Sequence, residues 1–404
     1  MRFATAYFFK GTNERIGLTG RYHSTELPDF ILDLISDGLT NLDSNLLPQP
    51  SISSSWETPD KGKTWTFNIN NELFWHDGIP LRSTNINYDF GDVEIETPDD
   101  YTISFKLQNP YTPFPAFVSK PIFSKGLVGI GNWTVDKISV VGSFVQEITL
   151  VNAQGDKKVY KFFPTTNRTK LSFKLGEVDK IVNLLNPSPF DTWNTTEIEK
   201  NTNKNQVVTL FYNTQDKLLS DKSIRQALTY AINKEALGAR AISPISPSSW
   251  AYNPQVKDYS HDLDKAKKTI DELPGELKEV LNIHLITSPA LLDVAEEISN
   301  DWQKIGINSQ ILVSSIIPND FQTYLTIFDI PVDPDQYSIW HSTQVVNNIS
   351  KYKNDRIDKL LEDGRATLEY KERKRIYLDF QRFLLEDLPA AFLYHPDYFT
   401  VSRK

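Results

Sequence analysis

The chain of 404 residues contains no cysteine and no long apolar run. Without thiols it has no disulfide, no thiolate nucleophile and no zinc–thiolate site. No apolar stretch approaches the roughly 20 residues that a membrane-spanning helix needs. Residues 1–10 are apolar but too short for the core of a secretion signal with a cleavage site. Their length predicts a first strand rather than the remnant of a membrane anchor.

Other absences narrow the chemistry further. The chain has no glycine-rich phosphate loop, so we do not expect it to handle ATP itself. Its six histidines lack metal-binding spacings such as His-Glu-x-x-His, and we expect neither a metal nor a cofactor. The net charge is −9 and no basic stripe is visible, which argues against nucleic acid as a partner.

The chain does contain enough apolar material for more than one core. Hydrophobic residues make up 39% of it and aromatic residues 12%. A chain of this length exceeds what one compact core supports, so two or three domains are expected. The many aromatic rings either fill cores or line a ligand cleft, and composition alone leaves both open.

The first half of the chain is patterned mainly as strands and turns. Pro28 is expected to open a helix over residues 29–36, and Gly38 to stop it. Residues 63–69 and 101–107 alternate between apolar and polar side chains, which predicts two strands. Residues 147–152 and 158–163 flank a Gln-Gly-Asp turn and predict a hairpin.

From about residue 207 the pattern changes to alternating strands and helices. We expect strands over 207–212, 281–286 and 307–313, and helices beginning at Ser220 or Asp221, at Asp262 and at Ala290. Gly306 is placed to end the last of these helices. This order predicts βαβ units on a mostly parallel sheet. Residues 241–254 form a proline- and serine-rich loop that carries Trp250 and Tyr252.

One pair of residues invites a catalytic interpretation. His76 and Asp77 are adjacent in Trp75-His-Asp-Gly78, but neighbours on a strand point to opposite faces. The Asp-Gly pair instead predicts a tight turn. Because no nucleophile and base stand out together, we do not expect an enzyme, and a carboxylate-based hydrolase is only a remote alternative.

Several short segments carry a family resemblance through their order along the chain. They are Asp37-Gly-Leu-Thr40, Lys63-Thr-Trp-Thr-Phe67, Trp75-His-Asp-Gly-Ile-Pro80, Phe211-Tyr-Asn-Thr214, Ile224-Arg-Gln-Ala-Leu-Thr-Tyr-Ala-Ile232, Trp302-Gln-Lys-Ile-Gly-Ile307 and Asp333-Pro-Asp-Gln-Tyr337. In this order the chain resembles the extracellular solute-binding proteins of family 5, the oligopeptide and dipeptide receptors of ABC importers. The resemblance covers nearly the whole chain.

The resemblance implies an α/β, two-lobed fold of the type II periplasmic-binding-protein kind. The first lobe would hold residues 1–206, with a small β-rich subdomain at about 46–125. The second lobe would hold 207–392, and 393–404 would return to the first as a strand. The implied function is that of the substrate-binding receptor of an ABC importer, which captures a peptide-like solute between its lobes. The same role for a sugar or a metal chelate is the alternative.

The resemblance also implies partners, a location and a binding site. The partners would be permease subunits with a separate ATPase, and the receptor would be a monomer. It would work in the periplasm or at the outer face of the bacterial membrane, anchored through a segment absent from this chain. Asp329 would bind the ammonium of a peptide, and Thr25, Glu26 and Leu27 would pair with its main chain. Trp250, Tyr252, Tyr337 and Trp340 are candidates for pocket walls or for packing.

The chain departs from the family pattern in a few places. The spacing between Asp329 and Asp333-Pro334 is one residue longer than in the peptide receptors. The segment after Tyr88 is short, and the chain stops at Lys404, where relatives continue with a tail that packs on the first lobe. A fragment at both ends and a reduced member of the family both fit these departures.

Overall fold

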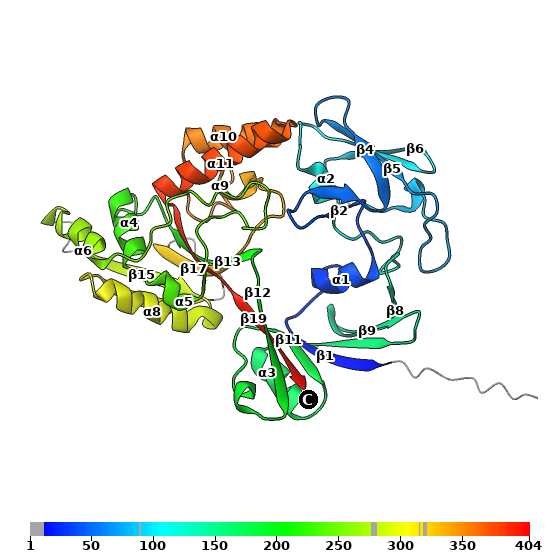
Figure 1. The fold of residues 1–404 in the computed structure, drawn as a ribbon, viewed down its shortest axis with the longest axis horizontal. Helices are drawn as coiled ribbons and strands as arrows, with labels where there is room; N and C mark the ends of the chain where they lie inside the picture. The colour runs from blue at the N-terminus through cyan, green and yellow to red at the C-terminus, as the bar shows by residue number, and fades with distance from the viewer. Residues whose placement is uncertain (1–11, 89, 276–280, 315, 318–320) are drawn as a thin grey trace, which may run out of the picture. The chain divides into compact units, whose positions relative to one another are not determined.

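The computed structural model describes residues 12–88, 90–275, 281–314, 316–317 and 321–404. The strand expected at residues 1–10 therefore lies outside the described residues. The chain divides into two compact units, each drawn in Figure 1. The first unit comprises Met1–Asp43, Pro48–Asn201 and Tyr398–Lys404, and the second comprises Ser44–Leu47 and Thr202–Asp397. The boundaries expected from the sequence, at 206/207 and 392/393, stay predictions.

The first unit is built on a seven-stranded sheet of order β12-β19-β11-β1-β10-β9-β8. Its strand β1 is parallel to β10 and β11, whereas β9 is antiparallel to both β8 and β10. The hairpin predicted around Gly155 is confirmed as β9 and β10. The strands are β1 (Asn13–Thr19), β8 (Trp133–Val141), β9 (Phe144–Asn152), β10 (Lys157–Phe163), β11 (Lys180–Leu184), β12 (Thr196–Thr202) and β19 (Asp397–Arg403).

A separate four-stranded antiparallel sheet, of order β4-β5-β7-β6, has its own core in the first unit. Phe67 and Phe105 alternate inward from β5 and β7 and meet edge to face, with ring centroids 5.8 Å apart. Both strands were predicted from their alternation, and both are confirmed. The strands are β4 (Ser53–Glu57), β5 (Thr64–Ile69), β6 (Glu94–Asp99) and β7 (Thr102–Lys106), beside the two-stranded ribbon of β2 (Thr40–Leu42) and β3 (Pro48–Pro50).

The predicted early helix is α1 (Asp29–Ile35), but Gly38 does not stop it as expected. Ser36 ends the helix in an extended conformation, so no left-handed glycine is needed there. A Cβ on Gly38 would instead lie 2.4 Å from the Ser119 carbonyl carbon, so glycine is required by close backbone packing. The other helices of this unit are α2 (Phe114–Phe117), α3 (Thr166–Lys174) and the 3₁₀ turns η1 (Ser83–Asn85) and η2 (Phe190–Thr192).

The second unit contains a six-stranded sheet of order β14-β18-β13-β17-β15-β16. The predicted strand–helix–strand unit is confirmed, since β15 and β16 are parallel. The expectation of a mostly parallel sheet is wrong, because β13 is antiparallel to both of its neighbours. A strand buried on both faces reads the same in either direction, so its sequence does not reveal this. The strands are β13 (Gln206–Tyr212), β14 (Ala239–Arg240), β15 (Asn282–Thr287), β16 (Asn308–Val313), β17 (Thr323–Asp329) and β18 (Ala390–His395).

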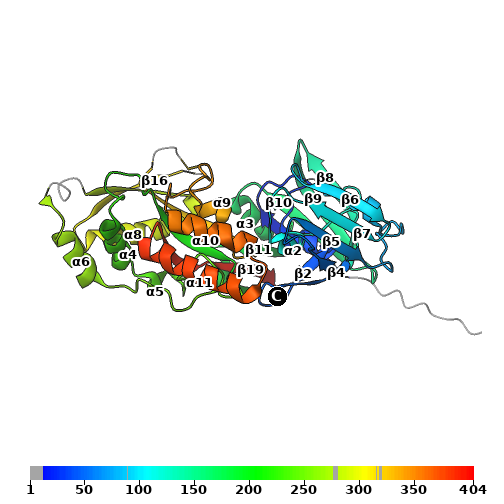
Figure 2. The same cartoon turned by 90° about the horizontal axis from the view of Figure 1, so that it is seen from above.

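Helices cover both faces of this sheet. One core cluster gathers Leu210 with side chains of α4, α6 and α8, and another gathers Phe211 with side chains of α9, α10 and α11. Figures 1 and 2 show α10 and α11 side by side. The helices are α4 (Lys222–Ala231), α5 (Lys234–Leu237), α6 (Leu263–Asp271), α8 (Leu292–Gln303), α9 (Tyr337–Trp340), α10 (Asp355–Ala366) and α11 (Tyr370–Asp387), with the 3₁₀ turn η3 (Pro289–Leu291) before α8.

Side-chain caps begin two of the three predicted helices, α4 and α6, whereas α8 begins at Leu292, two residues after the predicted start, without a side-chain cap. The Asp221 carboxylate accepts a hydrogen bond from the Ser223 N–H, and the Asp262 carboxylate accepts one from the Lys265 N–H. Both satisfy amides that a first helical turn leaves without partners. Gly306 follows α8 with a φ of +82°, as expected of a glycine that ends a helix.

The chain crosses between the seven-stranded and the six-stranded sheet twice. At each crossing, a strand of one sheet is followed in the sequence by a strand of the other. β12 leads into β13, and β18 leads into β19. The connecting residues bond to one another: the Asn203 N–H donates to the Pro396 carbonyl at 2.9 Å, and the Thr202 hydroxyl donates to the Asp397 carboxylate at 2.6 Å. The His395 Nδ1 lies 2.7 Å from the Gln206 carbonyl oxygen.

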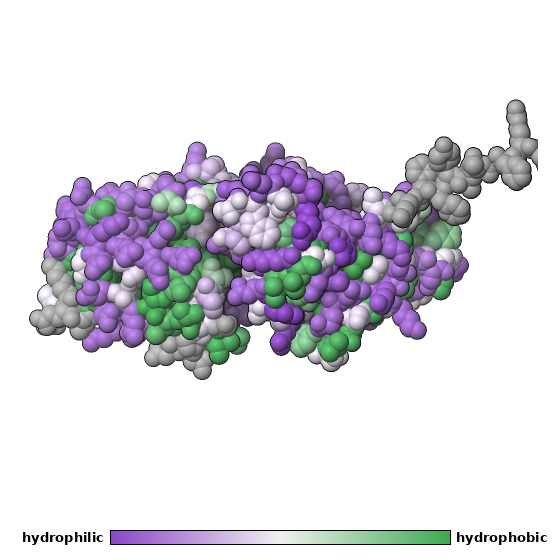
Figure 3. Space-filling view, turned by 90° about the horizontal axis from the view of Figure 1, so that it is seen from below, coloured by the Kyte–Doolittle hydropathy of each residue, from purple (hydrophilic) through white to green (hydrophobic). Residues whose placement is uncertain are grey.

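Figure 3 shows one face of the molecule, on which hydrophilic residues predominate and hydrophobic ones gather in separate groups. Among the described residues, no helix is both long and apolar enough to cross a membrane.

Candidate functional site

Two of the predicted residues, Tyr337 and Trp340, lie in α9, directly after the loop at 333–336. Two arginines hold this loop. The Arg373 guanidinium donates to both Asp333 carboxylate oxygens, at 2.9 and 2.5 Å, and its Nε donates to the Gly364 carbonyl. The Arg365 Nε donates to the Asp335 carboxylate at 3.1 Å. The start of α9 is therefore tied to both α10 and α11.

Burial and the neighbouring charges shift the pKa values of the ion-paired side chains at this loop in opposite directions. Burial alone would lower the pKa of Arg373, but the Asp333 carboxylate raises it above its ordinary value. For Asp335, burial raises the carboxyl pKa and the Arg365 guanidinium offsets only part of that rise. Because two buried acids are each met by an arginine, the loop is held by charge-assisted bonds.

Trp340 lies in the core of the second unit, with only 1% of its surface exposed. Its indole N–H donates to the Gln336 side-chain oxygen at 2.7 Å, and the Gln336 amide donates to the Pro244 carbonyl at 2.6 Å. Its ring packs 5.9 Å from that of Phe211 on β13. Trp340 thus joins α9 to the central strand and to the proline-rich loop.

Tyr337 is half-buried and lies between a ring and a cation. Its ring stacks on the His341 imidazole with centroids 4.0 Å apart, and the Arg365 guanidinium lies 4.2 Å from its centre. Because the side chain keeps part of its surface exposed, it can still contact a ligand.

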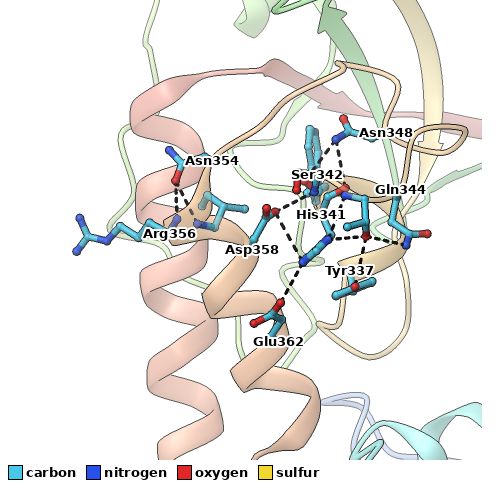
Figure 4. A network of polar contacts seen from close by, with 12 residues as sticks. Tyr337, His341, Ser342, Gln344, Asn348, Asn354, Arg356, Asp358 and Glu362 are labelled. Carbon is cyan, nitrogen blue, oxygen red and sulfur yellow. Dashed lines mark hydrogen bonds and ion pairs between the residues drawn. The ribbon is translucent and has the colours of Figure 1, made fainter. Parts of the chain in front are cut away.

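His341 is the centre of the polar network in Figure 4, where its imidazole points toward α10. The Thr343 N–H donates to Nδ1, which makes Nδ1 the acceptor and assigns the ring proton to Nε2. Nε2 lies 3.4 Å from the Glu362 carboxylate and 4.0 Å from that of Asp358. The Asp358 carboxylate also accepts from the Ser342 N–H at 2.9 Å. The network fixes the ring on which Tyr337 stacks.

The loop at 241–254 is held by a glutamine that sequence reasoning missed. Gln381 of α11 is fully buried, and its side-chain oxygen accepts from the Ser243 hydroxyl and the Asn253 N–H. Its amide donates to the Ala251 carbonyl at 2.8 Å. A glutamine inside an amphipathic helix is the only signal in the sequence, and it does not reveal the partners.

The two rings of this loop differ in accessibility. Trp250 is buried and packs 4.9 Å from the Tyr370 ring and 5.4 Å from the Arg373 guanidinium. Tyr252 is half-buried, and burial raises the pKa of its hydroxyl. Trp250 is therefore part of the core, whereas Tyr252 retains exposed surface.

Asp329 is exposed at the end of β17 and is already hydrogen-bonded. The Gln206 amide, its partner across the β13–β17 pair, donates to its carboxylate at 2.6 Å. Phe328 belongs to the core cluster that contains Trp340, and strand alternation sends the Asp329 side chain to the opposite face. The structure therefore does not place Asp329 and Trp340 on one face of the sheet, and an ammonium-binding role for Asp329 stays a prediction.

In the first unit, Thr25 and Glu26 are exposed and Leu27 is buried. The Glu26 N–H donates to the His23 carbonyl at 3.0 Å, so these residues form a turn rather than an extended strand. Pairing with a ligand main chain stays a prediction for them. The neighbouring Ser24 borders a cavity of about 450 Å³ whose apolar wall includes Leu127, Val135 and Ile138.

His76 also borders this cavity, and it does not form a pair with Asp77. Its Nε2 lies 2.8 Å from the Gly131 carbonyl oxygen, while the Asp77 carboxylate accepts from the Ile79 N–H. Gly78 has a φ of +81°, which confirms the predicted tight turn. In the part of the chain that the structure describes, no group of three histidine or acidic side chains could hold a metal.

Comparison with known proteins finds similarity to solute-binding proteins. The family model "Bacterial extracellular solute-binding proteins, family 5 Middle" matches residues 151–344. The dipeptide-binding protein of Escherichia coli is 24% identical to the chain over 449 aligned positions, which cover 88% of this chain and 82% of that protein.

Two solved structures share the fold at low identity. NikZ from Campylobacter jejuni, in complex with Ni(L-His), has a TM-score of 0.78 at 20% identity, covering 97% of this chain and 94% of that one. The oligopeptide-binding protein AppA from Bacillus subtilis, in complex with a nonapeptide, has a TM-score of 0.73 at 22% identity, covering 98% and 95%. The type II periplasmic-binding-protein fold expected from the sequence is thereby confirmed.

Proposed function

Because the chain belongs to family 5 of the bacterial extracellular solute-binding proteins, we propose that it is the substrate-binding receptor of an ABC importer and captures a peptide-like solute. The observation that carries this proposal is the near full-length match to a dipeptide-binding protein, 88% of this chain against 82% of that protein. A match over that length includes residues of both units.

The predicted binding residues divide into two groups by exposure. Asp329, Thr25 and Glu26 are exposed, and Tyr337 and Tyr252 are half-buried. We infer that these five contact the solute. Trp340, Trp250 and Leu27 are buried, and we infer that they support the walls from behind. Tyr337 is the most preorganised of these residues for binding, because its contacts with His341 and Arg365 already fix its ring.

The experiment that tests the proposal is a binding screen. Purified protein is mixed with a library of di- to pentapeptides and analysed by native mass spectrometry. A subset of peptides is expected to form one-to-one complexes. Absence of any complex across the library contradicts a peptide-like solute.

A second candidate is a non-peptide solute, a metal chelate before a sugar. It is favoured by the fold shared with a protein that binds Ni(L-His), at a TM-score of 0.78, and by the bond that Asp329 already makes to Gln206. Asp329→Ala separates the two candidates, because it removes an ammonium partner that only a peptide needs. Asp293→Ala, an exposed acid in the first turn of α8, is the matched control.

Partners and location follow from the same proposal. The receptor delivers its solute, as a monomer, to permease subunits driven by a separate ATPase. It works in the periplasm or on the outer face of the bacterial membrane. Solute recovered chemically unchanged after long incubation is expected of a receptor, and cleaved solute would favour the remote hydrolase alternative.

A further inference from the structure

A polar cavity in the second unit lies apart from all the predicted ligand-binding residues. Its volume is about 320 Å³, and it lies where α4 begins and α11 ends. Its wall comes from the turns before α4, from residues 351–353, and from Asp387, the last residue of α11. None of the predicted solute-contacting residues contributes to it.

The inner wall of this cavity holds a buried cation. Arg225 of α4 is only 5% exposed. Its guanidinium donates to the main-chain carbonyls of Leu219, Ser220, Asp387 and Leu388. Among the described residues, no carboxylate lies within ion-pairing distance of it. These carbonyls satisfy its hydrogen bonds. Burial lowers its pKa, and the more distant charges of Asp387 and Asp221 offset only part of that shift.

The one carboxylate that lines the cavity is committed to other groups. Asp387 Oδ2 accepts from the Tyr352 hydroxyl at 2.6 Å and from the Asn354 amide at 2.8 Å. Its Oδ1 lies 3.6 Å from the Lys222 ammonium. The single negative charge of Asp387 therefore already interacts with several donors.

Two further lysines, Lys351 and Lys353, flank Tyr352 in the sequence. Tyr352 is buried, Lys353 is exposed and Lys351 is half-buried, and both lysines line the cavity. Among the residues that the structure describes, the Lys353 ammonium has no hydrogen-bond or ion-pair partner. The lining of the cavity therefore includes the basic side chains of Lys222, Arg225, Lys351 and Lys353 and one carboxylate, that of Asp387.

We propose that this cavity binds a phosphate-like oxyanion. The excess of cations excludes a metal ion or an ammonium ligand, and the polar wall gives an apolar ligand little to contact. An oxyanion can accept from several lysines at once and add negative charge beside Arg225, which makes no direct ion pair. The phosphate is either a free ion or part of a lipid headgroup, since the chemistry recognised is the same.

The test compares two double variants with the native chain. Lys351→Gln with Lys353→Gln removes two cations from the cavity. Lys267→Gln with Lys371→Gln removes two exposed lysines that do not line it. The two double variants have the same net charge, so nonspecific electrostatic effects on anion binding are the same in both. Binding of inorganic phosphate is measured by calorimetry and by thermal unfolding at constant ionic strength, with chloride as the balancing ion.

The native chain and the Lys267/Lys371 variant are expected to bind phosphate saturably and to be stabilised by it, because binding to the folded state raises its stability. The Lys351/Lys353 variant is expected to bind about tenfold more weakly or worse. It should still bind peptides from the library, which separates this test from that of the proposed function. Equal phosphate affinity in the two variants, or equal effects of phosphate and chloride, overturns the proposal.

A second arm identifies the source of the phosphate. Sedimentation with phosphatidylglycerol vesicles is compared with sedimentation with neutral phosphatidylcholine vesicles. Association with the anionic vesicles that is lost only in the Lys351/Lys353 variant supports the site and assigns it to a lipid headgroup. Association unchanged in that variant, together with no saturable binding of free phosphate, overturns the site for both sources.

Discussion

Arg373 and Asp333 form a two-point ion pair, with nitrogen–oxygen distances of 2.9 and 2.5 Å and side chains only 7% and 13% exposed. The pair joins the long helix α11 to the loop that enters α9. Because Tyr337 begins α9, this contact positions a residue that we propose to touch the solute.

Breaking this pair from one side is expected to be costly. Arg373→Met leaves the Asp333 carboxylate buried without its partner, and the free energy of unfolding should fall by about 3–5 kcal/mol. Arg373→Lys should be intermediate, because an ammonium cannot donate in the same two-point geometry. Chemical denaturation monitored by tryptophan fluorescence measures both.

The double variant Arg373→Met with Asp333→Leu controls for the lost charge. It should be more stable than the single Arg373 variant, because no unpaired charge remains. A double variant no more stable than the single one would show that packing, rather than the ion pair, holds the loop.

Truncation of Trp340 should affect mainly stability, and truncation of Tyr337 mainly solute binding. Trp340→Ala opens a cavity beside Phe211 and should cost about 3–5 kcal/mol of unfolding free energy. Tyr337→Ala removes a half-buried ring and should cost about 1 kcal/mol. It should nevertheless weaken binding of the solute found in the library. Full affinity in a folded Tyr337→Ala protein would remove Tyr337 from the site.

Gly38 should not tolerate even one added methyl group. Gly38→Ala places a Cβ 2.4 Å from the Ser119 carbonyl carbon, and relief by backbone movement should cost about 2–3 kcal/mol. Gly91→Ala is the control, because a Cβ there has nothing within 4 Å. Thermal unfolding of the two variants measures the difference, and equal midpoints would contradict it.

Lys234 should make stability depend on pH. It is the first residue of α5, its side chain is fully buried, and its ammonium donates to the Thr229 and Ile232 carbonyls. Burial lowers its pKa to about 7 from the usual 10.5. Between these values the unfolded chain binds more protons than the folded one, so the free energy of unfolding rises with pH.

The measurement compares the native chain with Lys234→Met at pH 7, 8 and 9. The difference should grow in favour of the native chain by about 2–3 kcal/mol over this range, at up to about 1.4 kcal/mol per unit. Below about pH 7 it should level off, because both states are then protonated. A difference that is constant with pH would mean that Lys234 stays charged in the folded protein.

The local patterns predicted elements well because the forces that set them are local. The alternation over 63–69 and the turn at Gly155 needed only neighbouring residues to specify β5 and the β9–β10 hairpin. The antiparallel direction of β13 depends on partners more than one hundred residues away, such as Asp329 opposite Gln206, and a buried run does not encode it.

The sequence suggests which residues are candidates for the site, but it does not show how they are arranged. The rings at 250, 252, 337 and 340 stand out in the sequence, yet nothing there distinguishes the buried Trp340 from the half-buried Tyr337. Gln381 and Arg373 were missed because their partners lie on other segments. Such roles emerge only when helices α10 and α11 pack against the loops.

The central claim is that the chain is a receptor for a peptide-like solute. Isothermal titration of the native protein with the best peptide from the library tests it most directly. The account predicts saturable one-to-one binding with a Kd in the micromolar range, about −8 kcal/mol, weakened by acetylating the peptide amine. No saturable heat with any library peptide, together with tight binding of a nickel–histidine chelate, would contradict the claim.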